Sequence, residues 1–549
     1  MSAGTGVAPE TARFAAVERE LADMARVLAA LPRRISDIPA LQATRAPGAS
    51  ALREGQRVWT YSELTVAIER CATDLAALGI RGGDRVLIVG ENCAAFVAVL
   101  LATARLDAWA VPVNARLSAR EIDAIRAHCA PRRVVYLTHV SPDAAAHAAR
   151  HGASEPWNPA AIGDLMLGCS DDECRPEPVS EDPAMQVAAL LYTSGTTGDP
   201  KGVMLTHRNL LYIARLSSAL RMLVESDLVY GVLPISHVYG LASVCLGTLF
   251  AGACVHLEPR YSPQAMLRAL AQEGITVLQG VPSMYARLLD FMRSSGALLD
   301  APALRLCYAG GSPLTPALKA DAERAFGAPL HNGYGLTEAS PTIAHTRLDA
   351  PRDDCSVGML LPGLDMRIAD LVDPRHGNAL EGEPGELWVR GPNVMRGYYR
   401  DPALTARTID HDGWLNTGDI ARRDPDGALF IVGRTKELII RSGFNVYPIE
   451  VESVLNAHPA VSQSAVIGRP VDGNEEVVAF VELSPGGTAT PEEVARFAAE
   501  RLAPYKRPAE VVILPALPTA ATGKILKHRL RAMATRSSGV PDQEYHHVA

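Results

Sequence analysis

The sequence predicts an α/β protein: a large N-terminal domain of parallel sheets covered by helices, with a small β-barrel-like part, followed by a small α+β C-terminal domain. Three observations support this fold class. The chain has 549 residues, which is too long for one compact core. Buried-strand patterns alternate with helical patterns through most of its length, as in parallel sheets covered on both faces. Near residue 380 the strands become short and are separated by glycine turns.

The elements follow in order along the chain. Apolar residues recur at three- and four-residue spacing from Phe14 to Leu31 and predict a first amphipathic helix. Thr60 and Glu63 have capping-box spacing, which predicts the start of a second helix. Buried strands separated by helical patterns are then expected at residues 84–90, 109–113, 185–193, 227–234, 275–281 and 304–310.

The last third of the sequence has a different texture. Residues 381–399 and 426–434 are expected to form short antiparallel strands. A smaller α+β unit follows, with helices at 448–458 and 491–503 and strands at 461–468, 476–483 and 510–518. We therefore expect a large domain at 1–433, a hinge at 434–436, a small domain at 437–535 and a disordered tail at 536–549.

Composition excludes several classes of protein. Hydrophobic content of 48% and charged content of 21% are ordinary for a globular protein, and the net charge of −8 argues against a nucleic-acid partner. The nine cysteines include no CxxC pair, so thiols in a reducing cytoplasm are favoured over a metal or redox site. The start of the chain lacks a signal-peptide pattern, and the apolar run at 93–106 is too short to span a bilayer. These features predict a cytoplasmic protein without a membrane span.

The stretch YTSGTTGDPKG, from Tyr192 to Gly202, directly follows a predicted strand. In parallel sheets ligands bind at the carboxyl ends of strands. Backbone N–H groups, hydroxyls and Lys201 could there hold phosphate oxygens. The loop is not a P-loop, because Pro200 precedes the lysine and Gly202, not a serine or threonine, follows it directly. A surface turn without a ligand is the alternative reading.

Three further stretches carry candidate chemistry. Thr337 and Glu338, in NGYGLTEAS, suit phosphate and Mg²⁺, although both residue types are also favoured at helix N-termini. Asp419 suits ribose hydroxyls, although an aspartate after glycine is usually a turn residue. Lys524 follows a glycine and precedes a basic helix, where a solvated lysine is the default.

Together, YTSGTTGDPKG, YGLTE, TGD, GRTKE and TGK resemble the adenylate-forming superfamily of acyl-CoA synthetases, firefly luciferases and peptide-synthetase adenylation domains. The resemblance covers roughly residues 30 to 532. It implies that a carboxylate attacks the α-phosphate of ATP, that pyrophosphate leaves, and that a thiol then displaces AMP. It also implies Mg²⁺, coenzyme A as a second substrate, and a C-terminal domain that is mobile between the two steps.

The resemblance also implies the site residues. For ATP binding these are Thr193, Ser194, Gly195, Thr196, Thr197, Lys201, Gly311, Asn332, Gly333, Tyr334, Asp419 and Arg434. The catalytic residues are Lys524, Thr337, Glu338, which also binds Mg²⁺, and His237. The acyl pocket consists of His237, Val238, Tyr239, Gly240, Gln279, Gly280, Val281 and Gly310. The hinge and the CoA tunnel are formed by Lys436, Ser442 and Gly443.

Three functions remain open: a carboxylate–CoA ligase, an adenylation enzyme that loads a carrier-protein thiol, and a non-enzymatic nucleotide-binding protein. The segment LPISHVYGLAS has no carboxylate for an ammonium group, which counts against amino acids. The run from Phe430 to Glu452 leaves no room for the insertion of fatty-acyl-AMP ligases. We expect a CoA ligase that acts on a medium- or long-chain fatty acid, as part of fatty-acid metabolism, or on an aryl acid. No basic anchor is evident for a dicarboxylate, and Gly240 and Gly310 suggest space for the acyl group.

Overall fold

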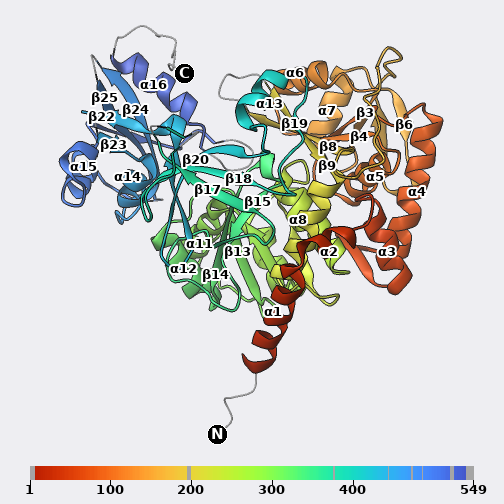
Figure 1. Cartoon of the computed structure of the whole chain (residues 1–549), viewed down its shortest axis with the longest axis horizontal. Helices are drawn as coiled ribbons and strands as arrows, with labels where there is room; N and C mark the ends of the chain where they lie inside the picture. The colour runs from red at the N-terminus through yellow and green to blue at the C-terminus, as the bar shows by residue number, and fades with distance from the viewer. Residues whose placement is uncertain are drawn as a thin grey trace. The chain divides into compact units, whose positions relative to one another are not determined.

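The computed structural model describes residues 7–194, 200–371, 373–374, 377–442, 444–471, 474–484, 486–519 and 525–538. The chain forms two compact units (Figure 1). The first comprises residues 1–311, 322–366 and 388–416, and the second comprises residues 312–321, 367–387 and 417–549. The domain limits expected from the sequence stay a prediction.

An eight-stranded sheet in the first unit has the order β19-β9-β8-β4-β3-β5-β7-β6. Its centre, from β8 to β5, is parallel, and the flanking strands are antiparallel. Every residue of β3 is buried, as its continuous apolar run predicts. The strands are β3 (Arg85–Gly90), β4 (Trp109–Asn114), β5 (Arg133–Tyr136), β6 (Glu155–Trp157), β7 (Leu165–Leu167), β8 (Val187–Ser194), β9 (Pro200–Thr206) and β19 (Gly397–Tyr398).

A nine-stranded sheet has the order β16-β15-β14-β13-β12-β10-β11-β1-β2. The six strands from β14 to β1 are parallel, and antiparallel strands close both ends. The strands are β1 (Ser50–Glu54), β2 (Arg57–Thr60), β10 (Leu228–Gly231), β11 (Cys254–Leu257), β12 (Val277–Gly280), β13 (Leu306–Gly310), β14 (Leu330–Gly335), β15 (Thr342–His345) and β16 (Met359–Leu360).

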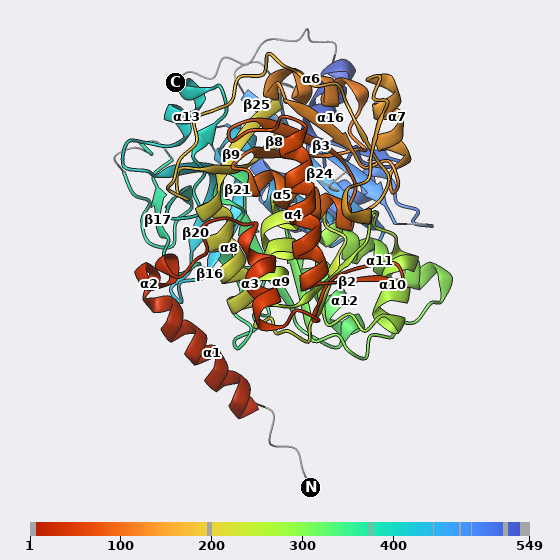
Figure 2. The same ribbon diagram turned by 90° about the vertical axis from the view of Figure 1, so that its right-hand side faces the viewer.

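A layer of helices lies between these two sheets (Figure 2). Helix α5 (Ala94–Arg105) packs against β3 and β4 of one sheet and β1 of the other, and this position explains its almost wholly apolar sequence. Helix α8 (His207–Leu220) packs against the π-helix η2 (Tyr239–Leu246) in the same core. The other helices up to residue 408 are α1 (Val7–Ala22), α2 (Met24–Ala29), α3 (Asp37–Arg45), α4 (Tyr61–Ala77), α6 (Ala119–Cys129), α7 (Pro142–Arg150), α9 (Gly247–Phe250), α10 (Pro263–Gln272), α11 (Pro282–Ser295), α12 (Pro316–Phe326) and α13 (Pro402–Thr408).

Local capping signals decide where two predicted helices begin. The capping box of Thr60 and Glu63 is confirmed at the start of α4, with both reciprocal hydrogen bonds formed. The expected single helix from Phe14 to Leu31 is instead two helices. Asp23 accepts a hydrogen bond from the Arg26 amide and starts α2, so α1 ends before it.

The small α+β part in the second unit is confirmed. Strands β24 (Val461–Val471), β25 (Asn474–Leu483) and β26 (Glu510–Leu514) form its sheet. Alternate residues face opposite sides: Val466 and Val477 pack with α14 and α15, whereas Ile467 and Phe480 pack with α16. The remaining elements are α14 (Pro448–Leu455), α15 (Pro491–Ala499), α16 (Lys527–Ser538) and the ribbon β22 (Ile439–Arg441) with β23 (Phe444–Val446).

The expected β-barrel-like part is an open sheet. Strands β17 (Asp365–Ala369), β18 (Gly385–Arg390), β20 (Leu415–Arg423) and β21 (Leu429–Arg434) form one row, and among the described strands β17 and β21 remain its edges. Four short strands are too few to close around a core of side chains. The rest of the predicted fold class is confirmed: parallel sheets covered by helices, followed by a smaller α+β part.

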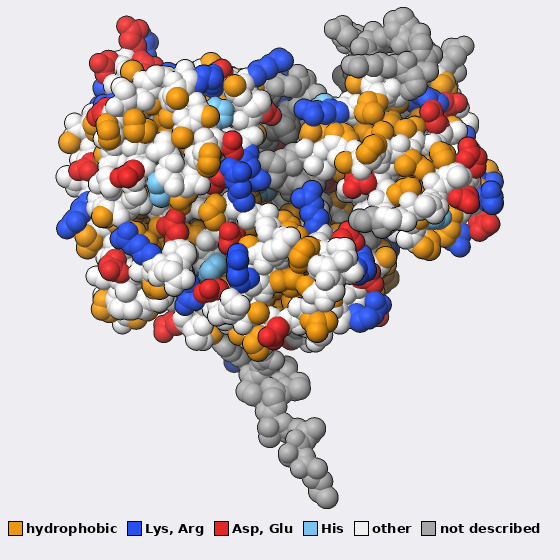
Figure 3. Space-filling view, turned by 180° about the vertical axis from the view of Figure 1, so that it is seen from behind, with side chains coloured by type: hydrophobic (Ala, Val, Ile, Leu, Met, Phe, Trp, Pro, Cys, Tyr) orange, Lys and Arg blue, Asp and Glu red, His pale blue; other side chains and the backbone are white. Residues whose placement is uncertain are grey.

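Two further features concern membrane-spanning helices and the distribution of charge. None of the described helices combines the length and apolarity needed to cross a bilayer. Acidic and basic side chains are interspersed over the face drawn in Figure 3.

Candidate active site

The predicted phosphate loop connects β8 and β9, which pair as antiparallel neighbours. Thr193 lies opposite Lys201 and Ser194 opposite Pro200, so the hairpin brings both ends of the motif together. At the base of the hairpin the Tyr192 hydroxyl lies 2.7 Å from His128 Nδ1. Gly195, Thr196 and Thr197 lie outside the described residues. The described part therefore places Thr193 and Lys201 side by side at the end of a buried strand.

Lys201 and Glu338 come from different motifs and meet around Tyr398. The Lys201 Nζ lies 6.0 Å from the centre of the Tyr398 ring. The Tyr398 hydroxyl donates a hydrogen bond of 2.8 Å to Glu338 Oε1. Burial, and then the Glu338 carboxylate, raise the pKa of Tyr398, so the hydroxyl keeps the proton that it donates. This contact fixes the carboxylate near the phosphate-loop lysine.

Strand pairing explains how Tyr398 reaches this place. Tyr398 lies in β19 and pairs with Val203 of β9, next to the phosphate hairpin. The backbone amide of Met395 donates to the Glu338 carbonyl over 2.9 Å, which joins the same segment to the YGLTE motif. This link could not be predicted from the sequence, because residues 338 and 398 are sixty positions apart and tyrosine is common in strands.

The YGLTE motif itself is held by backbone geometry. It runs from β14 into a short 3₁₀ turn at Thr337–Ala339, where Thr337 is buried. A side chain at Gly335 would meet the Pro341 carbonyl at 2.0 Å, so only glycine fits there. Asn332 donates its side-chain amide to the carbonyls of Cys355 and Ser356, and it therefore positions a neighbouring loop. Asn332 thus lies within β14, and Thr337 and Glu338 follow the carboxyl end of the same strand.

Two glycines at the ends of parallel strands create a flat surface beside Tyr239. Gly310 of β13 pairs with Gly333 of β14. A Cβ atom at Gly310 would lie 3.4 Å from the Tyr239 ring, and one at Gly333 would lie 2.1 Å from the Tyr308 hydroxyl. The left-handed backbone at Gly311 then turns the chain away from the strand. Tyr239, Gly310 and Gly333 are therefore neighbours, as expected for adjoining acyl and nucleotide sites.

The other residues expected in the acyl pocket do not all share this face. Gly280 faces Tyr285 and Met284 of α11 on the opposite side of the sheet. Val238 is fully buried in the core between the two sheets. Gln279 shares the face of Tyr308, and Val281 lies 3.5 Å from the position of a Cβ atom at Gly311. His237 precedes this face, and its Nδ1 accepts from the Tyr239 amide over 3.3 Å.

Gly240 has a different reason for being glycine than the one expected. A Cβ atom there would lie 2.2 Å from the Pro234 carbonyl and 2.6 Å from the Leu233 carbonyl. Backbone carbonyls thus occupy the place of a side chain at Gly240, and no space for an acyl chain is left there. The interpretation of Gly240 as a source of room for the acyl group was wrong.

In the second unit, Asp419 and Arg434 are brought together. They are opposite residues of β20 and β21, and Arg434 Nε lies 2.9 Å from Asp419 Oδ1. Asp419 is buried, while the arginine side chain is 46% exposed. The left-handed backbone of Gly418 and a bond from the Asp419 amide to Thr417 Oγ1 shape the turn before the carboxylate. The two expected ribose ligands form one ion pair.

The expected hinge and CoA residues lie on exposed turns. Lys436 is exposed in a 3₁₀ turn at Thr435–Glu437. Ser442 has left-handed backbone, and Asn474 holds it through hydrogen bonds to its amide and hydroxyl. Gly443 and Lys524 lie outside the described residues, so their predicted roles stay predictions.

Two basic side chains near the C-terminus are engaged in ion pairs. Lys527 Nζ lies 2.8 Å from carboxylate oxygens of both Glu437 and Glu452. Burial alone would lower the pKa of Lys527, but the two carboxylates raise it above its ordinary value. Lys506 pairs with Glu450 at 2.5 Å. These lysines are structural partners of acids within their own unit.

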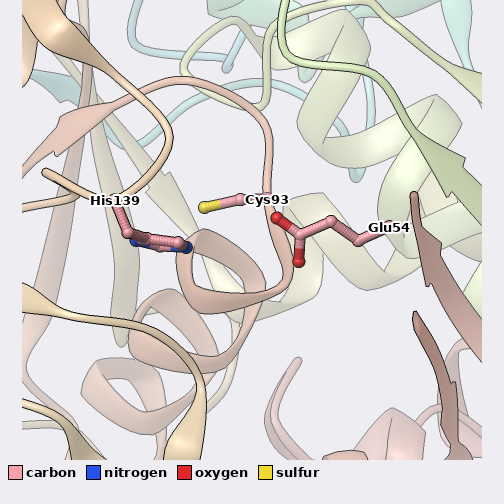
Figure 4. Close-up of side chains that lie close together, drawn as sticks. All are labelled: Glu54, Cys93 and His139. Atoms are coloured by element: carbon pink, nitrogen blue, oxygen red, sulfur yellow. The ribbon is translucent and has the colours of Figure 1, made fainter. Parts of the chain in front are cut away.

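One group of described residues has a composition suited to a metal ion. Candidate ligand atoms of Glu54, Cys93 and His139 lie within 4.8 Å of one another, and their side chains converge in Figure 4. The thiol accepts from the Phe96 amide over 3.4 Å and Glu54 from the Ala94 amide over 3.1 Å, so both cap α5. Burial raises the pKa of Cys93, which keeps the thiol protonated. Glu338, the expected Mg²⁺ ligand, is not in this group.

Comparison with known proteins identifies the family. The model of AMP-binding enzymes matches residues 40–399, and the model of the AMP-binding enzyme C-terminal domain matches residues 450–524. A feruloyl-CoA synthase of an Amycolatopsis species is 37% identical over 500 residues, covering 90% of this chain and 97% of the relative. The 4-coumarate–CoA ligase 2 of Oryza sativa subsp. japonica is 34% identical over 520 residues, covering 87% and 88%.

Solved structures agree with these relatives. The crystal structure of ATP-bound MatB from Rhodopseudomonas palustris aligns with a TM-score of 0.77 and 31% identity, covering 91% of this chain and 98% of that one. The expected enzyme class, an acid–thiol ligase of the AMP-forming type, is confirmed by relatives named as CoA ligases and synthases. The chain belongs to the family of AMP-binding enzymes, which confirms the resemblance of its motifs to the adenylate-forming superfamily.

Proposed function

We propose that the protein is an ATP- and Mg²⁺-dependent ligase that joins an aryl acid of the hydroxycinnamate type to coenzyme A. The observation that carries the proposal is the arrangement around Tyr239. Its ring stands beside Gly310 and Gly333 at the carboxyl ends of β13 and β14, next to the motif that carries Thr337 and Glu338. A flat ring fits against two glycines, and the relatives named for ferulate and 4-coumarate support this substrate class. Those relatives give no support to the fatty-acid alternative.

In the first step a carboxylate oxygen of the acid attacks the α-phosphorus of ATP and pyrophosphate leaves. Both reactants are anions, so positive charge and N–H or O–H donors must be held where negative charge develops. Lys201 and the hydroxyls of the phosphate loop are suited to the β- and γ-phosphates, and Thr337 to the α-phosphate. Glu338 would hold Mg²⁺, which offsets phosphate charge when bound, and Tyr398 holds this carboxylate in place. Lys524 would bridge the carboxylate and the phosphate.

In the second step the CoA thiol attacks the acyl carbonyl, the thioester C–S bond forms and AMP leaves. Lys436 would act as the hinge that removes Lys524, with Ser442 and Gly443 beside the pantetheine path. Asp419 and Arg434 would hold the ribose, and their ion pair already fixes the carboxylate in position. His237 would stand beside the acyl carbonyl, since the loop that carries it leads into Tyr239.

The test is pyrophosphate release from ATP over a panel of acids, with the thioester product measured in the same reactions. The panel contains cinnamate, 4-coumarate, ferulate, benzoate, octanoate, dodecanoate and phenylalanine. We expect CoA-dependent turnover with kcat/KM for a hydroxycinnamate at least about tenfold above that for either fatty acid. Favourable contacts within one substrate pocket provide discrimination of this size. The Lys524→Ala variant serves as the control and should lose at least about a hundredfold in adenylation.

Two results would contradict the proposal. Preference for a fatty acid over every aryl acid would refute the substrate class. Pyrophosphate release with trapped adenylate but without a CoA thioester would point to a carrier-protein thiol as the acceptor instead.

A further inference from the structure

A buried arginine lies next to the proposed acyl site. Arg221 directly follows α8 and is only 4% exposed, and its guanidinium carbon lies 4.5 Å from the centre of the Tyr308 ring. The carboxyl end of a helix favours a positive charge, and the ring face adds a cation–π contact. Neither replaces an anion, because burying an unpaired charge is costly.

No acid balances this charge. Among the described residues no carboxylate forms an ion pair with Arg221, and its Nε atom has no hydrogen-bond partner. Arg305, which is nearby on the approach to β13, shows the usual arrangement: it holds the buried carboxylate of Asp227 at 2.8 Å through its Nε. The neighbouring His345 is neutral, because burial and then the Arg221 charge lower its pKa to about 3.

The arginine faces a row of polar side chains across the nine-stranded sheet. Gln279, Tyr308 and His331 are register partners on β12, β13 and β14, so they share one face. The Gln279 oxygen and nitrogen and the hydroxyls of Tyr239 and Tyr308 are buried without a hydrogen-bond partner among the described residues. Burial raises the pKa of both tyrosines, and the Arg221 guanidinium, which lies beside each hydroxyl, opposes that rise through its charge and a side-chain contact.

Such a concentration of unused groups is unusual in a folded protein, where buried polar atoms are normally paired. The cluster is continuous with the proposed acyl site: the Tyr239 hydroxyl lies 3.6 Å from the position of a Cβ atom at Gly310, and the Tyr308 hydroxyl covers Gly333. A guanidinium can only donate, and the tyrosine hydroxyls and the glutamine amide can also donate. The matching ligand group is therefore an oxygen that accepts hydrogen bonds.

We propose that Arg221, Tyr239, Tyr308 and Gln279 recognise an oxygen-bearing substituent at the end of the acyl substrate away from the reacting carboxylate. This inference rests on the proposed function and names the substrate more closely: a phenol, an aryl ether or a second carboxylate in place of a bare ring. It also assigns to the acyl site a basic anchor, which was not evident in the sequence. That anchor was missed because Arg221 ends a helix in sequence and shows its position only in the fold.

The experiment compares Arg221→Met with wild-type protein on cinnamate and on its 4-hydroxy, 4-methoxy and 4-carboxy derivatives, by CoA-dependent pyrophosphate release. For each variant, the rate with each derivative is divided by the rate with cinnamate. Partial misfolding lowers both rates equally and therefore cancels from the ratio. We expect wild-type protein to prefer at least one oxygen-bearing acid, and Arg221→Met to reduce that preference by about 10- to 100-fold. Arg215→Met in α8, the helix that precedes Arg221, removes the ion-pair partner of Glu20 and should leave the ratio unchanged.

The three derivatives distinguish which oxygen-bearing group is recognised. Loss confined to 4-carboxycinnamate assigns a second carboxylate, loss confined to 4-hydroxycinnamate assigns a phenol, and loss that includes 4-methoxycinnamate assigns any acceptor oxygen. An equal loss for all four acids, or no change in the ratios, would overturn the role of Arg221. If wild-type protein prefers fatty acids, the proposed function fails by itself, and the ratio of octanedioate to octanoate then tests Arg221 in the same way.

Discussion

Two basic side chains, the partly buried Lys527 and the buried Arg221, have opposite surroundings in the fold. Lys527 lies in the second unit and touches two carboxylates, from Glu437 and Glu452. Arg221 lies in the first unit against two tyrosines, and no acid among the described residues pairs with it. A buried charge with its partners in place is a structural element, whereas one without a partner is suited to an external anion or acceptor. The following predictions test this difference.

The largest effect is expected from Lys527→Met. The substitution leaves two carboxylates close together and mostly buried, with side-chain exposures of 23% and 13%, so we expect a loss of about 3 kcal/mol in the free energy of unfolding. Urea unfolding measures this loss. The control is Lys506→Met, whose partner Glu450 is 43% exposed, with an expected loss below about 1 kcal/mol. Equal losses of unfolding free energy in Lys527→Met and Lys506→Met would show that Lys527 is no more important for stability than an exposed ion pair.

Arg305→Met should cost slightly less, about 2 kcal/mol, because the arginine side chain is 36% exposed although Asp227 is buried. This pair also predicts a dependence on pH. Burial alone would raise the pKa of Asp227, but hydrogen bonds from Arg305 and the Val224 amide lower it below its ordinary value. The stabilisation is therefore present above the unfolded pKa near 3.9 and is lost as the pH falls through the lower folded value.

The measurement is urea unfolding of wild-type protein and Arg305→Met at several pH values between about 6 and 3. The difference in stability should be constant at the upper end and should shrink as Asp227 protonates. A difference that grows towards low pH would contradict the assigned sign.

Tyr398→Phe removes the hydroxyl that holds Glu338 without changing the ring beside Lys201. We expect adenylation to slow by about tenfold, equivalent to about 1.4 kcal/mol, with unchanged folding. The rate should recover in part at high Mg²⁺ concentration if the carboxylate binds the ion. Kinetics at two Mg²⁺ concentrations decide this, and an unaltered rate would show that the hydroxyl does not position Glu338 for the reaction.

The smallest effect on stability is expected from Arg221→Met. An unpaired buried charge contributes little to folding, so its replacement by an apolar side chain of similar length should change the free energy of unfolding by less than about 1 kcal/mol in either direction. Thermal unfolding of the substrate-free protein measures this. A loss as large as that for Lys527→Met would show that Arg221 is structural, and the comparison between the two residues would fail.

Local signals in the sequence were sufficient for much of the fold and for the motifs. Continuous apolar runs predicted the buried strands, and Thr60 with Glu63 predicted the start of α4. The prediction of a β-barrel-like part was wrong, because short strands with glycine turns do not reveal whether the edges of a sheet meet. Contacts between distant residues could not be predicted: Tyr398 reaches Glu338 only through the pairing of β19 with β9.

The acyl site shows the same limit more sharply. A glycine in sequence indicates that a side chain is excluded but does not tell what fills its place. At Gly310 it is the Tyr239 ring, at Gly280 a helix on the other face, and at Gly240 the chain's own carbonyls. Arg221 had no motif at all, and only the register of the strands opposite revealed its polar neighbours.

The proposed activity is tested most directly by a single-turnover reaction of the wild-type protein with ATP, Mg²⁺ and 4-coumarate, analysed by mass spectrometry before and after CoA is added. We expect 4-coumaroyl adenylate to accumulate on the protein and to be converted into the CoA thioester with release of AMP. Absence of the adenylate, while octanoate or dodecanoate forms one under the same conditions, would contradict it.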